Sequence, residues 1–146
     1  MKVLIFSGTT EGKRLAQTLL TIGGFQVTVS VATEYGAHSM EGVPGCTLLE
    51  GRLSCSGMER LLTEKKYGVV VDATHPYARE VTENLRLACT HAGVPYLRLI
   101  RESTPPDSNS LLAPSTEEAV QALCRMPGNI LLTTGAKELA RFCTVP

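Results

Sequence analysis

The first hundred residues alternate short apolar runs with longer stretches in which apolar residues recur every three or four positions. The short runs predict β-strands, and their continuous hydrophobicity is typical of strands covered on both faces of a parallel sheet. The longer stretches predict helices that bury one stripe of side chains. The predicted strands are 2–6, 26–31, 46–49, 67–72 and 96–100, and the predicted helices are 10–22, 54–66 and 76–92. This alternation predicts an α/β fold with a doubly wound parallel sheet.

The pattern changes after Arg101, because residues 102–110 contain no apolar side chain and include two adjacent prolines. We therefore expect a domain over 1–101 and a linker over 102–114. The remainder, 115–146, predicts a helix over 115–125, a strand over 129–133 and a helix over 136–142. One strand cannot close a second core, so this part either extends the first sheet or begins an incomplete second half.

A polar, glycine-containing loop joins the first predicted strand to its helix. Its residues are Ser7, Gly8, Thr9, Thr10, Glu11 and Gly12. Open α/β sheets bind phosphate at this position, over backbone N–H groups and a helix N-terminus. The spacing excludes an ATPase phosphate loop, and Thr10 stands where a dinucleotide pattern has its second glycine. A tight turn with glycine for close packing is the alternative reading of the same residues.

A second polar stretch follows the strand predicted over 67–72, and it contains Thr74, His75 and Tyr77. In the usual 3-2-1-4 strand order this strand lies beside the first, so both loops flank one crevice. Histidine in such a crevice can move protons, although an isolated His75 can equally cap the next helix. The tyrosine–lysine pair of short-chain dehydrogenases is absent, and the three histidines lack metal-ligand spacing.

Glu34 follows the second predicted strand, 22 residues after Gly12. A carboxylate here can accept hydrogen bonds from the ribose hydroxyls of NAD, whereas a solvated surface glutamate is the alternative. The sequence between Phe25 and Gly51 holds no lysine or arginine to neutralise a ribose 2′-phosphate. We therefore expect NADH to be preferred over NADPH, with Ser30 and Thr33 able to hydrogen-bond a phosphate if Glu34 points away.

Composition narrows the class of protein. The 14 basic and 14 acidic residues balance to a formal charge of +0, which disfavours a nucleic-acid partner. An apolar run of the roughly 20 residues that span a bilayer does not occur, so we expect a cytoplasmic protein without a membrane partner. The five cysteines form no C-x-x-C pair and are interpreted as reduced, mostly buried thiols rather than a redox or zinc site.

Five motifs, in order along the whole chain, resemble the precorrin-6A reductase family of cobalamin biosynthesis. They are FSGTTEGKRLA at 6–16, VSVATEYG at 29–36, DATHPYA at 72–78, YLRLIR at 96–101 and LLTTGAKEL at 131–139. The resemblance implies two Rossmann-like halves and the nicotinamide-dependent reduction of a double bond in a corrin-precursor macrocycle. Thr33-Glu34-Tyr35-Gly36 looks like the cobalt-first branch, which implies cobalt-precorrin-6A as substrate and no protein metal site. The chain departs from the family at Ser7, which replaces a frequent glycine, and it ends where the second half has only begun.

The resemblance and the loop positions together suggest roles for the candidate residues. Residues 7–12 would place the cofactor pyrophosphate, and Thr74, His75 and Tyr77 would line the crevice, with His75 as proton donor. Arg79, Arg98 and Arg101 are candidates for holding macrocycle carboxylates. The alternative is a nucleotide-binding module, truncated or split, that needs a second-half domain or partner chain. Another type of Rossmann enzyme, such as one acting on a sugar nucleotide, is a third reading.

Overall fold

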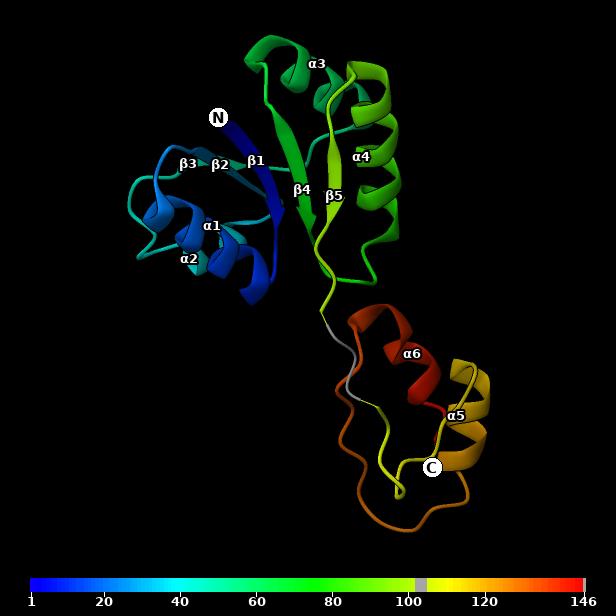
Figure 1. Cartoon of the computed structure of the whole chain (residues 1–146). Helices are drawn as coiled ribbons and strands as arrows, with labels where there is room; N and C mark the ends of the chain where they lie inside the picture. The colour runs from blue at the N-terminus through cyan, green and yellow to red at the C-terminus, as the bar shows by residue number, and fades with distance from the viewer. Residues whose placement is uncertain (102–104, 146) are drawn as a thin grey trace. The chain divides into compact units, whose positions relative to one another are not determined.

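Five parallel strands form the sheet of the N-terminal unit, in the order β3-β2-β1-β4-β5 (Figure 1). This computed structural model describes residues 1–101 and 105–145, and the chain divides into two units, Met1–Glu102 and Ser103–Pro146. The strands are β1 (Lys2–Ser7), β2 (Gln26–Val31), β3 (Thr47–Glu50), β4 (Val69–Ala73) and β5 (Tyr96–Arg98). The helices between them are α1 (Thr10–Ile22), α2 (Glu34–Ser39), α3 (Cys55–Lys65) and α4 (Arg79–Ala92). The predicted doubly wound parallel sheet is confirmed.

Helices cover both faces of this sheet, which explains why the central strands are apolar throughout. Val3 and Ile5 of β1 belong to a core on the side of α1, together with buried Ala16. Leu4 and Phe6 point to the other face, into a core with side chains of α3 and α4. Figure 1 shows α1 and α2 on one side of the strands and α3 and α4 on the other. Alternate side chains of one strand therefore serve two cores.

Two local expectations in this unit need correction. The chain after β2 forms the short helix α2, which was not predicted; Thr33 caps it by accepting a hydrogen bond from the Gly36 N–H at 3.1 Å. Six residues are too few for the periodic apolar pattern that predicts a helix. The helix expected from Pro76 begins instead at Arg79, because His75–Ala78 closes a turn in which the Ala78 N–H donates to the His75 carbonyl.

The C-terminal unit contains α5 (Thr116–Leu123), a 3₁₀ turn at Ala136–Glu138 and α6 (Leu139–Phe142). Ser115 caps α5 by accepting from the Glu118 N–H, as its position in the sequence predicts. The strand expected over 129–133 is wrong: this segment has no regular secondary structure. An apolar run becomes a strand only when another strand takes its backbone hydrogen bonds, and residues 105–145 supply none. Residues 102–104 of the expected linker lie outside the described residues.

The cysteines only partly follow expectation. All five are free thiols; Cys89 is buried, but Cys124 and Cys143 of the C-terminal unit are exposed. Burial, followed by the charge of Asp72, raises the pKa of the Cys89 thiol to about 11, so that it stays protonated. Within residues 1–101 and 105–145, the helices are too short or too polar to cross a membrane.

Candidate functional site

Three loops gather where β1, β2 and β4 end, at the carboxyl edge of the sheet. They are the segments 8–9, 32–33 and 74–78, and each leads into a helix. The chain leaves β1 toward β2 on one side, whereas β4 lies on the other side of β1. Open α/β sheets bind ligands in the crevice at such a reversal of strand order. The predicted adjacency of the first and fourth strands is confirmed, and it brings loops 8–9 and 74–78 together.

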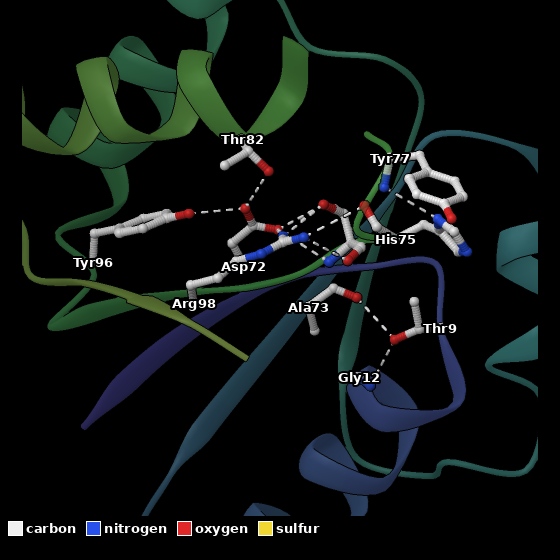
Figure 2. Close-up of polar contacts among 10 residues, drawn as sticks. Thr9, Gly12, Asp72, Ala73, His75, Tyr77, Thr82, Tyr96 and Arg98 are labelled. Carbon is white, nitrogen blue, oxygen red and sulfur yellow. Dashed lines mark hydrogen bonds and ion pairs between the residues drawn. The ribbon is translucent and has the colours of Figure 1, made fainter. Parts of the chain in front are cut away.

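Thr9 connects these two loops. Its hydroxyl donates a hydrogen bond to the Ala73 carbonyl at 2.9 Å and accepts one from the Gly12 N–H at 3.3 Å (Figure 2). Thr9 is thus the N-cap of α1, which fixes the start of this helix against the end of β4. Thr9, which the sequence predicted as a cofactor-binding residue, therefore lies between the two loops. Its hydroxyl is occupied by the two hydrogen bonds that hold them together. Thr10 opens α1 and is exposed.

Gly12 and Gly8 differ in their surroundings. A Cβ on buried Gly12 would stand 2.3 Å from Ser7 Oγ and 3.2 Å from Ala73 Cβ. At Gly8 an added Cβ would meet nothing within 4 Å. Gly12 therefore lets α1 approach β1 and β4 closely, as the alternative reading of this loop proposed, while Gly8 leaves the loop open.

Gly12→Ala is expected to lower the free energy of unfolding by about 1–3 kcal/mol, the usual cost of overpacking. The Ser7 and Ala73 side chains are themselves buried and have little room to move. Gly8→Ala is the matched control and should stay within about 0.5 kcal/mol of wild type. Urea unfolding of the two variants measures both values, and equal stabilities would contradict the packing role of Gly12.

Asp72 is the most deeply placed charge next to the crevice. It is the penultimate residue of β4 and has an exposed fraction of 0%. Its Oδ1 accepts hydrogen bonds from the Thr74 N–H at 3.0 Å and the Thr74 hydroxyl at 2.7 Å. Its Oδ2 accepts from the hydroxyls of Thr82 at 2.8 Å and Tyr96 at 2.9 Å, and Arg98 forms an ion pair with Oδ1. Figure 2 shows Thr82 of α4 and Tyr96 and Arg98 of β5 converging on the carboxylate.

These contacts determine the ionisation of the cluster. Burial by itself raises the pKa of Asp72, but hydrogen bonds from Thr74, Thr82 and Tyr96 outweigh it and hold the carboxyl pKa below its ordinary value. Burial and the hydrogen bond to Asp72 raise the pKa of the Tyr96 phenol. The carboxylate is therefore charged and the phenol neutral at physiological pH. With all its partners in place, Asp72 is a structural anion rather than a general base.

Arg98 extends this network to the loop after β4, residues 74–78, which carries His75. Its guanidinium donates to the Thr74 hydroxyl at 2.9 Å, to the Thr74 carbonyl at 3.0 Å and to the His75 carbonyl at 3.4 Å. The side chain of Arg98 is 19% exposed. Arg98 is thus engaged in holding the backbone of residues 74–75, which leaves it unsuited to the macrocycle carboxylates for which it was a candidate.

His75 and Tyr77 lie side by side in the loop that Arg98 holds. Both are exposed, and their ring centroids are 5.0 Å apart at a tilt of 54°. The Tyr77 N–H donates to His75 Nδ1 at 3.2 Å. An Nδ1 that accepts a hydrogen bond places the proton of a neutral imidazole on Nε2. His75 can therefore offer an Nε2–H to a molecule in the crevice.

Thr33 and Glu34 stand at the end of the neighbouring strand β2. The Thr33 hydroxyl is occupied by capping α2, and Glu34 is exposed in the first turn of that helix. Lys13 approaches the other end of α2, where its Nζ donates to the carbonyls of Ser39 and Glu41 at 2.7 and 2.9 Å. This cation is therefore directed to the far end of the helix from Glu34.

Glu11 forms an ion pair that the sequence did not predict. Its Oε1 lies 2.8 Å from Arg101 Nε, although the two residues are 90 positions apart. The hydrogen bond from Arg101 and the backbone hydrogen bond of Glu11 lower the pKa of the Glu11 carboxyl to about 2. The carboxylate of a predicted cofactor-binding residue is thus already paired in this structure.

The sequence alone assigned no individual role to Asp72, Thr82 or Tyr96. Hydrogen bonds from Thr82 and Tyr96 hold the Asp72 carboxylate, which in turn accepts from Thr74 of the candidate site. Asp72 carried one usable signal, a carboxylate at the end of an apolar run, where burial requires a partner. The identity of that partner could not be predicted, because Tyr96 and Arg98 lie more than twenty positions away. Among the described residues, no group of three or more His, Cys, Asp or Glu is arranged to hold a metal ion.

Comparisons with known proteins identify the relatives of this chain. Residues 2–146 match the family described as Precorrin-6x reductase CbiJ/CobK. The Cobalt-precorrin-6A reductase of Salmonella typhimurium is 35% identical, over 94% of this chain and 53% of the relative. The Precorrin-6A reductase of Rhodobacter capsulatus is 31% identical, over 99% of this chain and 57% of the relative. The chain thus spans about half the length of these curated relatives.

Solved structures give a consistent result for the fold. A structure described as CobK precorrin-6A reductase superposes with a TM-score of 0.67 at 27% identity, covering 87% of this chain and 48% of the other. A saccharopine dehydrogenase from Saccharomyces cerevisiae, 15% identical, superposes with a TM-score of 0.55 over 84% of this chain and 24% of the other. The second likeness concerns the fold alone.

Proposed function

The chain belongs to the precorrin-6x reductase CbiJ/CobK family, and we propose that it binds a nicotinamide dinucleotide for the reduction of a corrin-precursor macrocycle. The observation that carries this proposal is the family match over residues 2–146, combined with an open loop at the reversal of strand order. The proposed substrate is cobalt-precorrin-6A, with precorrin-6A as its metal-free counterpart. The resemblance of Thr33-Glu34-Tyr35-Gly36 to the cobalt-first branch of the family supports the cobalt-containing form.

The proposed cofactor site runs along the carboxyl ends of β1 and β2. Backbone N–H groups at the start of α1 would hold the pyrophosphate, because Gly8 leaves the loop open and Gly12 brings the helix close to the strands. Ser7 ends β1, and Thr9 and Thr10 border this position. Glu34 lies at the end of β2, where the adenosine ribose binds in folds of this type. These residues orient the cofactor without taking part in the chemistry.

The loop after β4 is the proposed reacting edge of the site. The nicotinamide, when bound, supplies a hydride for one carbon of a macrocycle double bond. The second carbon needs a proton, and its proposed source is Nε2 of protonated His75, which returns to a neutral imidazole. Protonation of Nδ1 would replace the hydrogen bond that the neutral ring accepts from the Tyr77 N–H. Thr74 and Arg98 hold the loop backbone, and exposed Tyr77 offers an aromatic surface beside the imidazole. His75 is thus the proposed acid, and Tyr77 its neighbour at the macrocycle edge.

The direct test combines a nucleotide titration with an anaerobic turnover assay. Purified chain is mixed with NADH and cobalt-precorrin-6A, and nicotinamide oxidation is followed together with the macrocycle spectrum. Oxidation that depends on both the chain and the macrocycle supports the reductase. Nucleotide binding without turnover would favour the second candidate, a nucleotide-binding module that needs a second-half domain or chain, which the coverage of about half of each relative motivates.

Nucleotide preference is a further expected result of this proposal. Glu34 is exposed at the end of β2, and nearby Lys13 is engaged at the far end of α2. A 2′-phosphate would meet this carboxylate without a compensating cation, at a cost of about 1–3 kcal/mol. NADH should therefore bind about tenfold to a hundredfold more tightly than NADPH. Calorimetric titration of the chain with each dinucleotide measures the ratio.

Glu34→Arg should shift this ratio toward NADPH, because the guanidinium can pair with the phosphate. Glu64→Arg is the matched control: Glu64 lies on α3 and makes a 4.0 Å surface pair with Arg60. The control should leave the ratio unchanged. Equal or tighter NADPH binding by the wild-type chain would exclude the proposed role of Glu34.

A further inference from the structure

The ion pair between Glu11 and Arg101 lies where the proposed dinucleotide must place its phosphates. Glu11 is the second residue of α1, so its carboxylate is in the first turn of that helix. Carboxylates are stabilised at helix N-termini for the same reason as phosphates, because backbone N–H groups there lack partners. A backbone hydrogen bond of Glu11 itself contributes to keeping this carboxyl ionised. In the free chain, a side-chain anion therefore stands at the proposed phosphate position.

Arg101 is placed to serve more than one anion. It follows β5, yet its Nε reaches Glu11 Oε1 at 2.8 Å. Its terminal nitrogens make no hydrogen bond with the described part of the chain, and 65% of its side chain is exposed. An arginine presents five N–H donors, and a single bond to Glu11 leaves most of them available. The side chain of Glu11 is 27% exposed and therefore more confined than its partner.

We propose that Arg101 binds a phosphate of the dinucleotide and that the Glu11 carboxylate occupies Arg101 in the free chain. Glu11 holds Arg101 over the N-terminus of α1 until the phosphate replaces the carboxylate as the partner of Arg101. This inference rests on the proposed function, since it assigns two residues within the same site. It reverses the role expected for Glu11 from the sequence, because Glu11 competes with the cofactor instead of binding it. It also assigns a cofactor phosphate to Arg101 as its ligand, where the sequence had suggested a macrocycle carboxylate.

The two roles predict opposite effects of two substitutions. Arg101→Ala removes a charge-assisted contact and should weaken NADH binding about tenfold to a hundredfold. Glu11→Gln removes the competing charge and should tighten NADH binding about threefold to tenfold. In the double variant, Arg101→Ala should still weaken binding relative to Glu11→Gln alone. Arg101→Lys should recover part of the affinity, because it keeps the charge but loses the planar group of donors.

Isothermal titration calorimetry with NADH, in the absence of macrocycle, measures these affinities independently of turnover. The control pair is Arg60→Ala and Glu64→Gln, which changes the same charges on α3 and should leave the dissociation constant unchanged. Weaker binding by Glu11→Gln would overturn the inference, as would unaltered NADH affinity in Arg101→Ala. If Arg101→Ala weakened only macrocycle binding, a carboxylate would be its ligand and the inference would be wrong. Absence of NADH binding by the wild-type chain would overturn the proposed function together with this inference.

Discussion

Replacing Asp72 by alanine is expected to lower the free energy of unfolding by about 3–5 kcal/mol, the cost of removing one member of a buried ion pair. The substitution leaves the guanidinium of Arg98, which is 19% exposed, without its anion. It also deprives the hydroxyls of Thr82 and Tyr96 of their acceptor. Folded domains are stable by only about 5–15 kcal/mol, so the variant should be partly unfolded under mild conditions. Urea unfolding followed by circular dichroism measures the loss.

Two further variants distinguish the network from a general effect of removing charge. Thr82→Val deletes one of the donors to Asp72 and should cost about 1 kcal/mol. Glu80→Ala removes an exposed carboxylate from the first turn of α4 and should cost no more than about 1 kcal/mol. A loss below about 1 kcal/mol in Asp72→Ala would show that the buried carboxylate is not required for stability.

The same carboxylate also makes stability depend on pH. The pKa of Asp72 is lower in the folded chain than its ordinary value of 3.8, so the unfolded chain binds the proton more tightly. Its contribution is fully present above that ordinary value and is lost as the pH falls through the folded pKa. The wild-type chain should therefore lose stability below about pH 4, and Asp72→Asn should flatten this dependence. Glu11 titrates in the same range, so the difference between wild type and variant is the quantity to compare.

His75→Ala is expected to reduce the single-turnover rate of macrocycle reduction by about 10²–10⁴-fold, the usual contribution of a positioned acid. The affinity for NADH should stay within about twofold, because His75 lies on the loop after β4 and the cofactor phosphates are assigned to the loop after β1. Stopped-flow spectroscopy under saturating NADH measures the rate. The side chain is exposed, so the substitution should leave the fold intact.

His91→Ala provides the matched control for this experiment. His91 lies on α4, where its Nδ1 is 2.7 Å from Glu59 of α3, and it has no place in the proposed site. Its removal should leave the turnover rate unchanged. Equal rates for wild type and His75→Ala would exclude His75 as the proton donor and would leave the proton to solvent.

Much of the fold could be predicted because local patterns of apolar residues and helix caps specify its strands and helices. The continuous apolar run at residues 2–6 indicated a central strand, and Gly23, with its positive φ of 81°, ends α1 where a glycine cap was expected. Elements without such patterns were missed or wrong. Helix α2 is too short to show the repeat of apolar residues that indicates a helix. The apolar segment 129–133 has the composition of a strand but pairs with no other strand among the described residues.

The candidate site was likewise predictable only in part. The sequence by itself determined which loops carry polar side chains, since Thr9, His75 and Glu34 follow apolar strands whose carboxyl ends share one edge of the sheet. The tertiary structure decided which of these side chains remain available. Thr9 and Thr33 are occupied as helix caps, and Glu11 is paired with Arg101.

The physical reason is that partners of buried and charged groups come from distant parts of the chain. Parallel pairing of β4 with β5 places Asp72 opposite Arg98, 26 positions later, and Arg101 returns to Glu11 across 90 positions. Neighbouring residues specify a strand or a helix through periodicity and capping, which are local properties. A hydrogen-bond acceptor instead finds its donors through the packing of the whole sheet, which no local pattern encodes.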